Sequence, residues 1–130
     1  MEQMAPTEYV GRAWIPPERM RIYVAGPYTR GDQAQNVRNA IYAGNFIAGL
    51  GHYPFIPHLS HFWHMLTPHD EIDFWYDQDM QWLRLCHAIL RLDGESHGAD
   101  EEVRTARELG LAVYTNVFDI PRFLPARREL

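Results

Sequence analysis

The sequence predicts an α/β fold in which a parallel sheet is flanked by helices on both faces, and three observations support this prediction. Short runs of β-branched, aromatic and aliphatic residues alternate along the chain with longer segments whose apolar residues recur every three or four positions. Strands that alternate with helices form βα units, whose strands pair in parallel. With 130 residues and no internal repeat, the chain has the size of a single domain.

The first half of the domain is predicted to contain a strand, a helix and a second strand. Residues 20–26 (MRIYVAG) form a short apolar run closed by glycine, which is typical of a buried strand. A helix is expected over 33–51, because Asp32 can cap its start and Gly51 can end it. Residues 52–57 (HYPFIP) predict the second strand, which a proline ends.

The second half continues the alternation after a loop rich in histidine and aromatic residues, which is expected from residue 58 to about residue 69. The same patterns then predict a helix over 71–86, a strand over 88–92, a helix over 99–109 and a strand over 111–117. In a parallel sheet of this kind, ligands bind beyond the carboxyl ends of the strands. The loops that follow these strands are therefore expected to surround one binding site.

Composition and charge narrow the possible partners and location. The net charge of -5 argues against binding to a nucleic-acid polymer, which requires clustered Lys and Arg. The single cysteine, Cys86, excludes a disulfide within the chain. No apolar run approaches the ~18 residues of a membrane span, and the N-terminus lacks the layout of a signal peptide. We therefore expect a cytoplasmic protein without a membrane partner, with an N-terminal arm over 1–19 and one domain over 20–130.

Two carboxylates are predicted to face the interior near this site. Asp79 falls on the apolar stripe of the helix predicted over 71–86, and Glu102 falls on the inner face of the next helix. The helix macrodipole favours an ionised Glu102, because that residue lies near a helix N-terminus. Two carboxylates separated by roughly 5–5.5 Å can cleave a glycosidic bond through a covalent intermediate. Alternatively, Asp79 bonds to a loop amide and has a structural role.

Three motifs occur in an order that resembles a known family. They are "YVAGPYT" at the first strand, "YDQDMQWL" around Asp79 and "GESHGADEEVRTARELG" around Glu102. Over about residues 20–115 they resemble the nucleoside 2-deoxyribosyltransferase family, and within it the branch of 2'-deoxynucleoside 5'-monophosphate N-glycosidases. The resemblance implies a flavodoxin-like or Rossmann-like fold, a homodimer or larger homo-oligomer, and cleavage of the N-glycosidic bond of deoxynucleosides or deoxynucleotides.

The resemblance assigns roles to particular residues. Glu102 corresponds to the catalytic glutamate of the family, Asp79 to an aspartate on the preceding helix, and Tyr23 to a tyrosine that orients the glutamate. Six residues before the glutamate, transferases acting on free nucleosides carry an acid, whereas the monophosphate branch carries a serine, and this chain has Ser96. A hydroxyl beside helix amides can donate to a phosphate that an acid would repel. Ser96 can also be a turn residue without such a role.

The loops at the mouth supply further substrate-binding candidates. Gly26, Tyr28 and Arg30 belong to the loop after the first strand, although Arg30 is displaced by one place from the corresponding arginine of the monophosphate branch. That branch also has a serine where this loop has Pro27, Tyr28 and Thr29. Gly98 is expected to let a ligand approach the start of the helix closely.

Aromatic residues on both sides of the central loop could stack on a base. Phe62 and Trp63 are expected to line the pocket, because they lie in the loop that follows the second strand. Trp75 and Tyr76 occur at helical spacing, where aromatic residues more often belong to the core, and they are expected there.

From these residues we expect cleavage of a small-molecule deoxynucleotide through a covalent intermediate. Ionised Glu102 would attack C1', and Asp79 would protonate or position the leaving base. Tyr23 would hold the Glu102 carboxylate. No metal and no organic cofactor are required for this chemistry.

Three other functions remain open from the sequence. A transferase would exchange bases on free deoxynucleosides through the same intermediate. A metal enzyme would use the histidines of the central loop, which are His58, His61, His64 and His69. However, no HExxH signature is present. A non-catalytic nucleotide-binding module would share the fold but would not cleave the ligand. The sequence does not identify the base.

Overall fold

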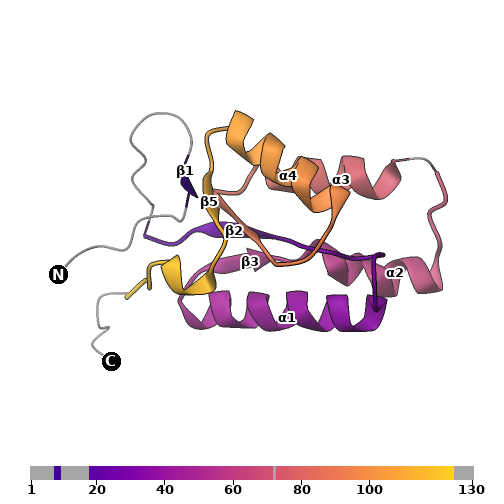
Figure 1. The fold of residues 1–130 in the computed structure, drawn as a ribbon, viewed down its shortest axis with the longest axis horizontal. Coiled ribbons are helices and arrows are strands. Elements are labelled where there is room, and N and C mark those ends of the chain that lie inside the picture. The colour runs from indigo at the N-terminus through magenta and orange to yellow at the C-terminus, as the bar shows by residue number, and fades with distance from the viewer. Residues whose placement is uncertain (1–7, 10–17, 72, 125–130) are drawn as a thin grey trace, which may run out of the picture.

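Four parallel strands, extended by one short antiparallel strand, form the central sheet of the computed structural model (Figure 1). The structure describes residues 8–9, 18–71 and 73–124. The strand order is β1-β5-β4-β2-β3, and the pairs β2–β3, β2–β4 and β4–β5 are parallel. The predicted fold class is therefore confirmed. The strands are β1 Glu8–Tyr9, β2 Arg21–Ala25, β3 Tyr53–Phe55, β4 Ala88–Arg91 and β5 Ala112–Tyr114.

The short strand β1 was not predicted. It lies within the segment expected to be an arm and pairs antiparallel with β5, with Glu8 opposite Val113. Two residues are too few to show the alternation by which a strand is recognised. Two parts of the predictions lie outside the described residues. They are the rest of the arm up to residue 17, and Ile72 within the helix predicted over 71–86. The domain boundary at residue 20 stays a prediction.

Helices cover both faces of the sheet (Figure 1). The helix α1 (Gln33–Gly49) lies on one face, and α3 (Phe74–Leu83) and α4 (His97–Glu108) lie on the other. Side chains of β2 alternate between two apolar clusters, as expected for a strand. Ile22 packs on the α1 side, whereas Tyr23 packs on the α3–α4 side. None of the described helices is both long and apolar enough to cross a membrane.

The predicted ends of α1 are confirmed, and each has a local physical cause. The Asp32 side chain accepts a hydrogen bond from the Gln35 backbone N–H at 3.1 Å, which caps the helix start. At the other end Gly51 has a φ of +95°. A Cβ at that position would lie 2.9 Å from the Phe123 carbonyl oxygen. Only glycine adopts this backbone without strain.

The prediction of a loop over residues 58–69 was wrong for residues 58–66, whereas residues 67–69 are non-helical as predicted. This segment forms a 3-10 helix, η1 (Pro57–Leu59), followed by a short helix, α2 (Ser60–Leu66). The helix α2 has no buried residue and no side-chain cap, so it lacks the apolar stripe and the start signal that identify a helix in sequence. It is held instead by aromatic contacts with the segment before and at the start of α3, such as the edge-on contact of Trp63 and Trp75.

Several predicted boundaries also change. The helix α3 begins at Phe74, and α4 begins at His97, two residues earlier than predicted, because the Ser96 side chain caps it. The predicted final strand is shorter, and Val117–Asp119 forms a second 3-10 helix, η2. These shifts place the start of α4 next to the carboxyl end of β4, where the binding site was expected.

Candidate active site

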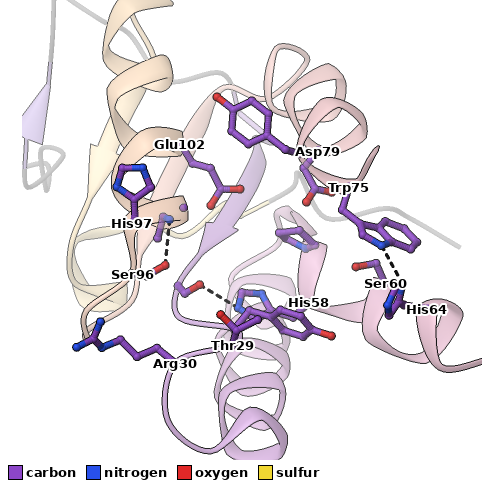
Figure 2. A pocket seen from close by; sticks show the side chains of 16 residues that line it. Thr29, Arg30, His58, Ser60, His64, Trp75, Asp79, Ser96, His97 and Glu102 are labelled. Carbon is purple, nitrogen blue, oxygen red and sulfur yellow. Dashed lines mark hydrogen bonds between the residues drawn. The ribbon is translucent and has the colours of Figure 1, made fainter. Parts of the chain in front are cut away.

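A pocket of about 520 Å³ lies beyond the carboxyl ends of β2 and β4 (Figure 2). Its volume is within the usual range for small-molecule sites. Four segments form its walls: the loop after β2, the η1–α2 segment, α3, and the start of α4. The lining residues are Gly26, Tyr28, Thr29, Arg30, Pro57, His58, Ser60, His64, Trp75, Tyr76, Asp79, Ser96, His97, Gly98, Ala99 and Glu102.

The three catalytic candidates meet in this region. Tyr23 is fully buried beneath the pocket, and its hydroxyl donates a hydrogen bond to Oε2 of Glu102. Burial and the negative charge of Glu102 raise the pKa of Tyr23 far above its ordinary value. The phenol therefore keeps its proton and acts as a hydrogen-bond donor. Figure 2 shows the carboxyl groups of Glu102 and Asp79 directed into the same cavity from α4 and α3.

Both carboxyl groups have raised proton affinity. Burial raises the pKa of Glu102 to about 7, although the hydrogen bond from Tyr23 and the charge of Arg91 act to lower it. Burial, and then the negative charge of Glu102, raises the pKa of Asp79 to about 7. The two groups therefore titrate near neutral pH and influence each other.

The expectation that the helix macrodipole keeps Glu102 ionised is corrected. Because α4 begins at His97, Glu102 is its sixth residue and lies beyond the first turn. The macrodipole effect decreases within the first turn, whereas the carboxyl group is largely buried. Desolvation is therefore the larger influence on the pKa of Glu102.

The other end of the pocket is polar. Ser96 accepts a hydrogen bond from the Ala99 backbone N–H at 3.0 Å, so it is the N-cap of α4. Its hydroxyl hydrogen has no partner in the described part of the chain and can still be donated. Arg30 pairs with Glu95 at 2.8 Å, and both side chains are exposed. The structural role considered for Ser96 and its position in the pocket thus coexist.

The two glycines at the mouth of the pocket differ in the physical reason for which glycine is needed. A Cβ at Gly26 would lie 3.0 Å from Cβ of Leu92, so packing inside the protein favours glycine there. A Cβ at Gly98 would meet nothing within 4 Å. The protein itself therefore leaves room for a side chain at position 98, and only a ligand in the pocket would require glycine.

The aromatic assignments made from sequence are corrected. Trp75 and Tyr76 line the pocket, whereas Phe62 and Trp63 are not among the lining residues. On α2 the pocket is lined by Ser60 and His64, which are four residues apart and share a helix face. Phe62 and Trp63 lie between them on other faces and are exposed.

The predicted stripe of α3 divides between two environments. Its first part, with Trp75 and Asp79, faces the pocket, and its last part, with Leu83, is buried in the core. Helical spacing identifies a face but does not distinguish core from cavity. This explains why Asp79 was placed correctly on an inward stripe while Trp75 was assigned to the core.

The histidines of the central segment have partners other than a metal ion. His58 is buried, and its Nε2 contacts the carbonyl oxygens of Gly26 at 3.2 Å and Pro27 at 3.0 Å. Burial lowers the pKa of His58, which favours the neutral ring. The described residues contain no group of three His, Cys, Asp or Glu side chains arranged to hold a metal. Sequence reasoning missed this role of His58, because nothing local distinguishes it from its neighbours.

Most of the remaining acids of the segment 93–102 lie outside the pocket. Asp93 and Glu95 are exposed, and Glu101 pairs with Arg104 at 2.8 Å, one turn further along α4. Asp100 bonds to Arg91 at 2.9 Å. Arg91 was not identified from the sequence, because its partners come from two separate segments.

Comparisons with known proteins identify a family and a related fold. Residues 20–116 match the model of a family described as a domain of unknown function (DUF7768). No curated protein matches the chain. The structure is similar to that of a 2-deoxyribosyltransferase from the psychrotolerant bacterium Bacillus psychrosaccharolyticus, with a TM-score of 0.55 and 20% sequence identity over 72% of this chain and 69% of that chain. At this identity the similarity shows a shared fold.

Proposed function

The chain belongs to the DUF7768 family, a domain of unknown function, and from its site we propose that it cleaves the N-glycosidic bond of a 2'-deoxynucleoside 5'-monophosphate. One observation carries this proposal. Glu102 and Asp79 face one pocket, Tyr23 donates to Glu102, and both carboxyl groups have pKa values raised to about 7. Groups with perturbed pKa values that converge in a cavity are typical of acid–base and nucleophilic sites.

The first chemical step uses the two carboxyl groups in different states. Ionised Glu102 attacks C1', the bond from C1' to the base nitrogen breaks, and its electron pair leaves with the base. Protonated Asp79 gives its proton to the departing base. The product is a glycosyl ester on Glu102 and a free base. Near neutral pH the two raised pKa values make one ionised and one protonated carboxyl group accessible together.

The second step regenerates the enzyme. Asp79, now ionised, accepts a proton from a water molecule as the water oxygen attacks C1'. The ester bond breaks, and Glu102 leaves as a carboxylate. Tyr23 has a positioning role in both steps, because its hydroxyl holds Oε2 of Glu102 and leaves the other carboxylate oxygen for C1'.

The polar end of the pocket supports a phosphate on the substrate. The hydroxyl of Ser96, the backbone N–H groups of the first turn of α4 and the guanidinium of Arg30 are donors that suit an anion. An acidic residue in place of Ser96 would repel a bound phosphate. These groups lie across the pocket from Trp75 and His64 in Figure 2, with Glu102 and Asp79 along the intervening wall.

The aromatic end of the pocket supports a base. The ring of Trp75 offers a flat surface for stacking. Nδ1 of His64 accepts hydrogen bonds from Trp75 Nε1 and from the His69 backbone N–H, both at 3.1 Å. A neutral His64 ring then carries its proton on Nε2, which makes it a donor for an acceptor atom of the base.

Base exchange between free deoxynucleosides is the second candidate function. The structure whose fold this chain shares is that of a 2-deoxyribosyltransferase. The same glycosyl ester would form, and a second base rather than water would attack C1'. Hydrolysis is preferred because Ser96, and not an acid, occupies the polar end of the pocket.

The test is chromatography of free base after incubation with a panel of deoxynucleosides and deoxynucleoside 5'-monophosphates. We expect release from monophosphates, loss of release in Glu102→Ala, and retention in Glu101→Ala. Glu101 is the matched control, because it is the neighbouring residue and pairs outward with Arg104. Exchange on free nucleosides would favour the transferase. A folded protein that binds the panel without turnover would favour a binding module.

A further inference from the structure

Arg91 is a mostly buried cation at the carboxyl end of β4, beside the proposed active site. It is the last residue of β4, at the edge of the sheet where the pocket lies, and it is paired in register with Ala25 of β2. Its side chain is only 16% exposed. It is not a lining residue of the pocket. A buried guanidinium is costly unless several acceptors surround it, so its partners indicate what it is used for.

The partners of Arg91 belong to the two segments that carry the site. Its guanidinium donates to the carbonyl oxygens of Leu92 and Gly94, the latter at 2.9 Å, in the loop after β4. It also donates to Oδ1 of Asp100 at 2.9 Å, in the first part of α4. One side chain therefore joins the end of a strand, the following loop and the following helix.

This arrangement fixes the positions of two residues of the pocket. Ser96 lies between Gly94 and Asp100, both of which bond to Arg91, and Glu102 lies two residues after Asp100. The loop is closely packed here, because Gly94 has a φ of +109° and a Cβ there would lie 2.8 Å from Cγ of Pro27. Loss of the Arg91 contacts would free the loop that carries Ser96 and the turn before Glu102.

The charge of Arg91 also acts on Glu102. Tyr23 of β2 reaches Glu102 from beneath the pocket. The titratable or charged groups that line the pocket come from every element that encloses it: Tyr28 and Arg30 of the loop after β2, His58 of η1, His64 of α2, Tyr76 and Asp79 of α3, and His97 of α4. Two of the groups that act on Glu102 lower its pKa: Tyr23 does so through its hydrogen bond, and Arg91 through its charge.

We propose that Arg91 is a positioning residue of this site, which ties the loop after β4 to the first part of α4 and biases Glu102 toward the ionised form that a nucleophile requires. The role in catalysis rests on the proposed function. The contacts and the electrostatic effect on Glu102 do not depend on it.

The test is a titration of the Glu102 carboxyl carbon by NMR in the full chain labelled with ¹³C at glutamate Cδ. Glu102→Gln assigns the signal. In Arg91→Met we expect the midpoint to rise by about half a pH unit or more, because a neighbouring positive charge is lost. Arg91→Lys keeps the positive charge but not the forked geometry of the guanidinium. The Glu102 midpoint in Arg91→Lys should therefore lie between those of the parent protein and Arg91→Met. Arg104→Met is the matched control, because this exposed arginine pairs with Glu101, and its midpoint should not move.

A pH profile of base release supplies the second readout. Because only ionised Glu102 attacks, the acidic limb of kcat/KM should move to higher pH in Arg91→Met by the same amount as the NMR midpoint. A purely structural role would reduce the rate equally at all pH values and leave the midpoint in place, and that result would overturn the inference. If Arg91→Met does not fold, the NMR midpoint and the pH profile of Arg91→Lys and Asp100→Asn are compared with those of the parent protein instead.

The two proposals fail in different ways. If no deoxynucleotide is cleaved and the midpoint still rises in Arg91→Met, the proposed function is wrong and the effect of Arg91 on Glu102 stands. If cleavage is observed and the midpoint does not move in a folded variant, the function stands and the inference about Arg91 is wrong.

Discussion

The two faces of the sheet differ in the polar groups that they bury. On the α1 face, Ile22 and Ile47 belong to an apolar cluster. The buried His52 nearby has both ring nitrogens in contact with backbone groups, at 3.1 and 2.6 Å. The Tyr114 hydroxyl, which is buried in the same cluster without a partner in the described residues, is neutral. Neither of these two buried groups is a carboxyl group.

The α3–α4 face has a similar apolar cluster, but its edge at the pocket is different. There Tyr23, Asp79 and Glu102 come together, and burial raises the pKa of each. Burying ionisable groups reduces stability at a pH where they would otherwise be charged. One face therefore contributes mainly stability, whereas the other contains groups whose perturbed pKa values are typical of functional sites.

The largest expected effect is on the rate, from Glu102→Gln. The substitution keeps the shape of the side chain and removes the nucleophile, so base release should fall at least about 10³-fold, or about 4 kcal/mol in transition-state free energy. Steady-state kinetics on the best monophosphate would measure it. Glu101→Gln should retain the rate of the parent protein. A Glu102→Gln protein that keeps a tenth of the activity would remove Glu102 from the mechanism.

A substitution on the opposite face should affect stability alone. Ile47→Ala creates a cavity in the cluster against α1, where Ile47 is fully buried, and should lower the free energy of unfolding by about 3 kcal/mol. Urea unfolding measures this loss. The kcat of the folded protein and the midpoints of its pH profile should stay unchanged. A shift of these midpoints would show that the two faces are coupled.

The pH dependence of stability should come from the α3–α4 face. In the folded chain the pKa values of Asp79 and Glu102 are about 7, above the ordinary values of 3.8 and 4.5. The folded chain thus binds more protons than the unfolded chain, and stability falls as the pH rises from about 4 through about 7. We expect a loss of at least about 2 kcal/mol between pH 5 and pH 8 in urea unfolding. The double variant Asp79→Asn/Glu102→Gln should lose most of this dependence; if it does not, other groups cause it.

Tyr23→Phe should separate positioning from packing. The ring remains in the core, but Glu102 loses a hydrogen-bond donor to its ionised form. The pKa of Glu102 should rise, the acidic limb of kcat/KM should move to higher pH, and kcat should fall about tenfold. Rates across a pH series measure both effects. An unchanged acidic limb would show that the hydrogen bond does not control the ionisation of Glu102.

The smallest effect is expected at the exposed rim. Glu95 pairs with Arg30, and a substrate phosphate would compete with this carboxylate for the same guanidinium. Glu95→Gln should therefore lower KM for a monophosphate about two- to threefold, because exposed ion pairs are weak. KM for a free deoxynucleoside serves as the control and should not change. Equal changes for both substrates would remove Arg30 from phosphate binding.

Local sequence signals were sufficient to predict several features that a short stretch of chain decides. The strand β2, the Asp32 cap of α1 and the turn at Gly51 depend on residues close in sequence, and all three were predicted. The same holds for the inward faces of α3 and α4, because helical period alone places Asp79 and Glu102 on them.

The features of the site that were missed depend on contacts between distant segments. The helix α2 is held by aromatic contacts with the region of α3, and His58 is held by the carbonyl groups of the loop after β2. The pocket role of Trp75 arises because the first turns of α3 extend beyond the sheet edge, where a cavity replaces the core. No spacing rule contains this information.

Hydrophobic period and capping act over a few residues, and they are therefore enough to predict strands β2 to β5, helices α1, α3 and α4, the ends of α1 and the inward direction of the two acids. How those acids ionise, and what holds them, follows from contacts that form only when the chain folds. The pKa of Glu102 depends on its burial, on Tyr23 from β2 and on Arg91 from β4. Desolvation and charge act through space, so the reactivity of Glu102 is a property of the folded chain.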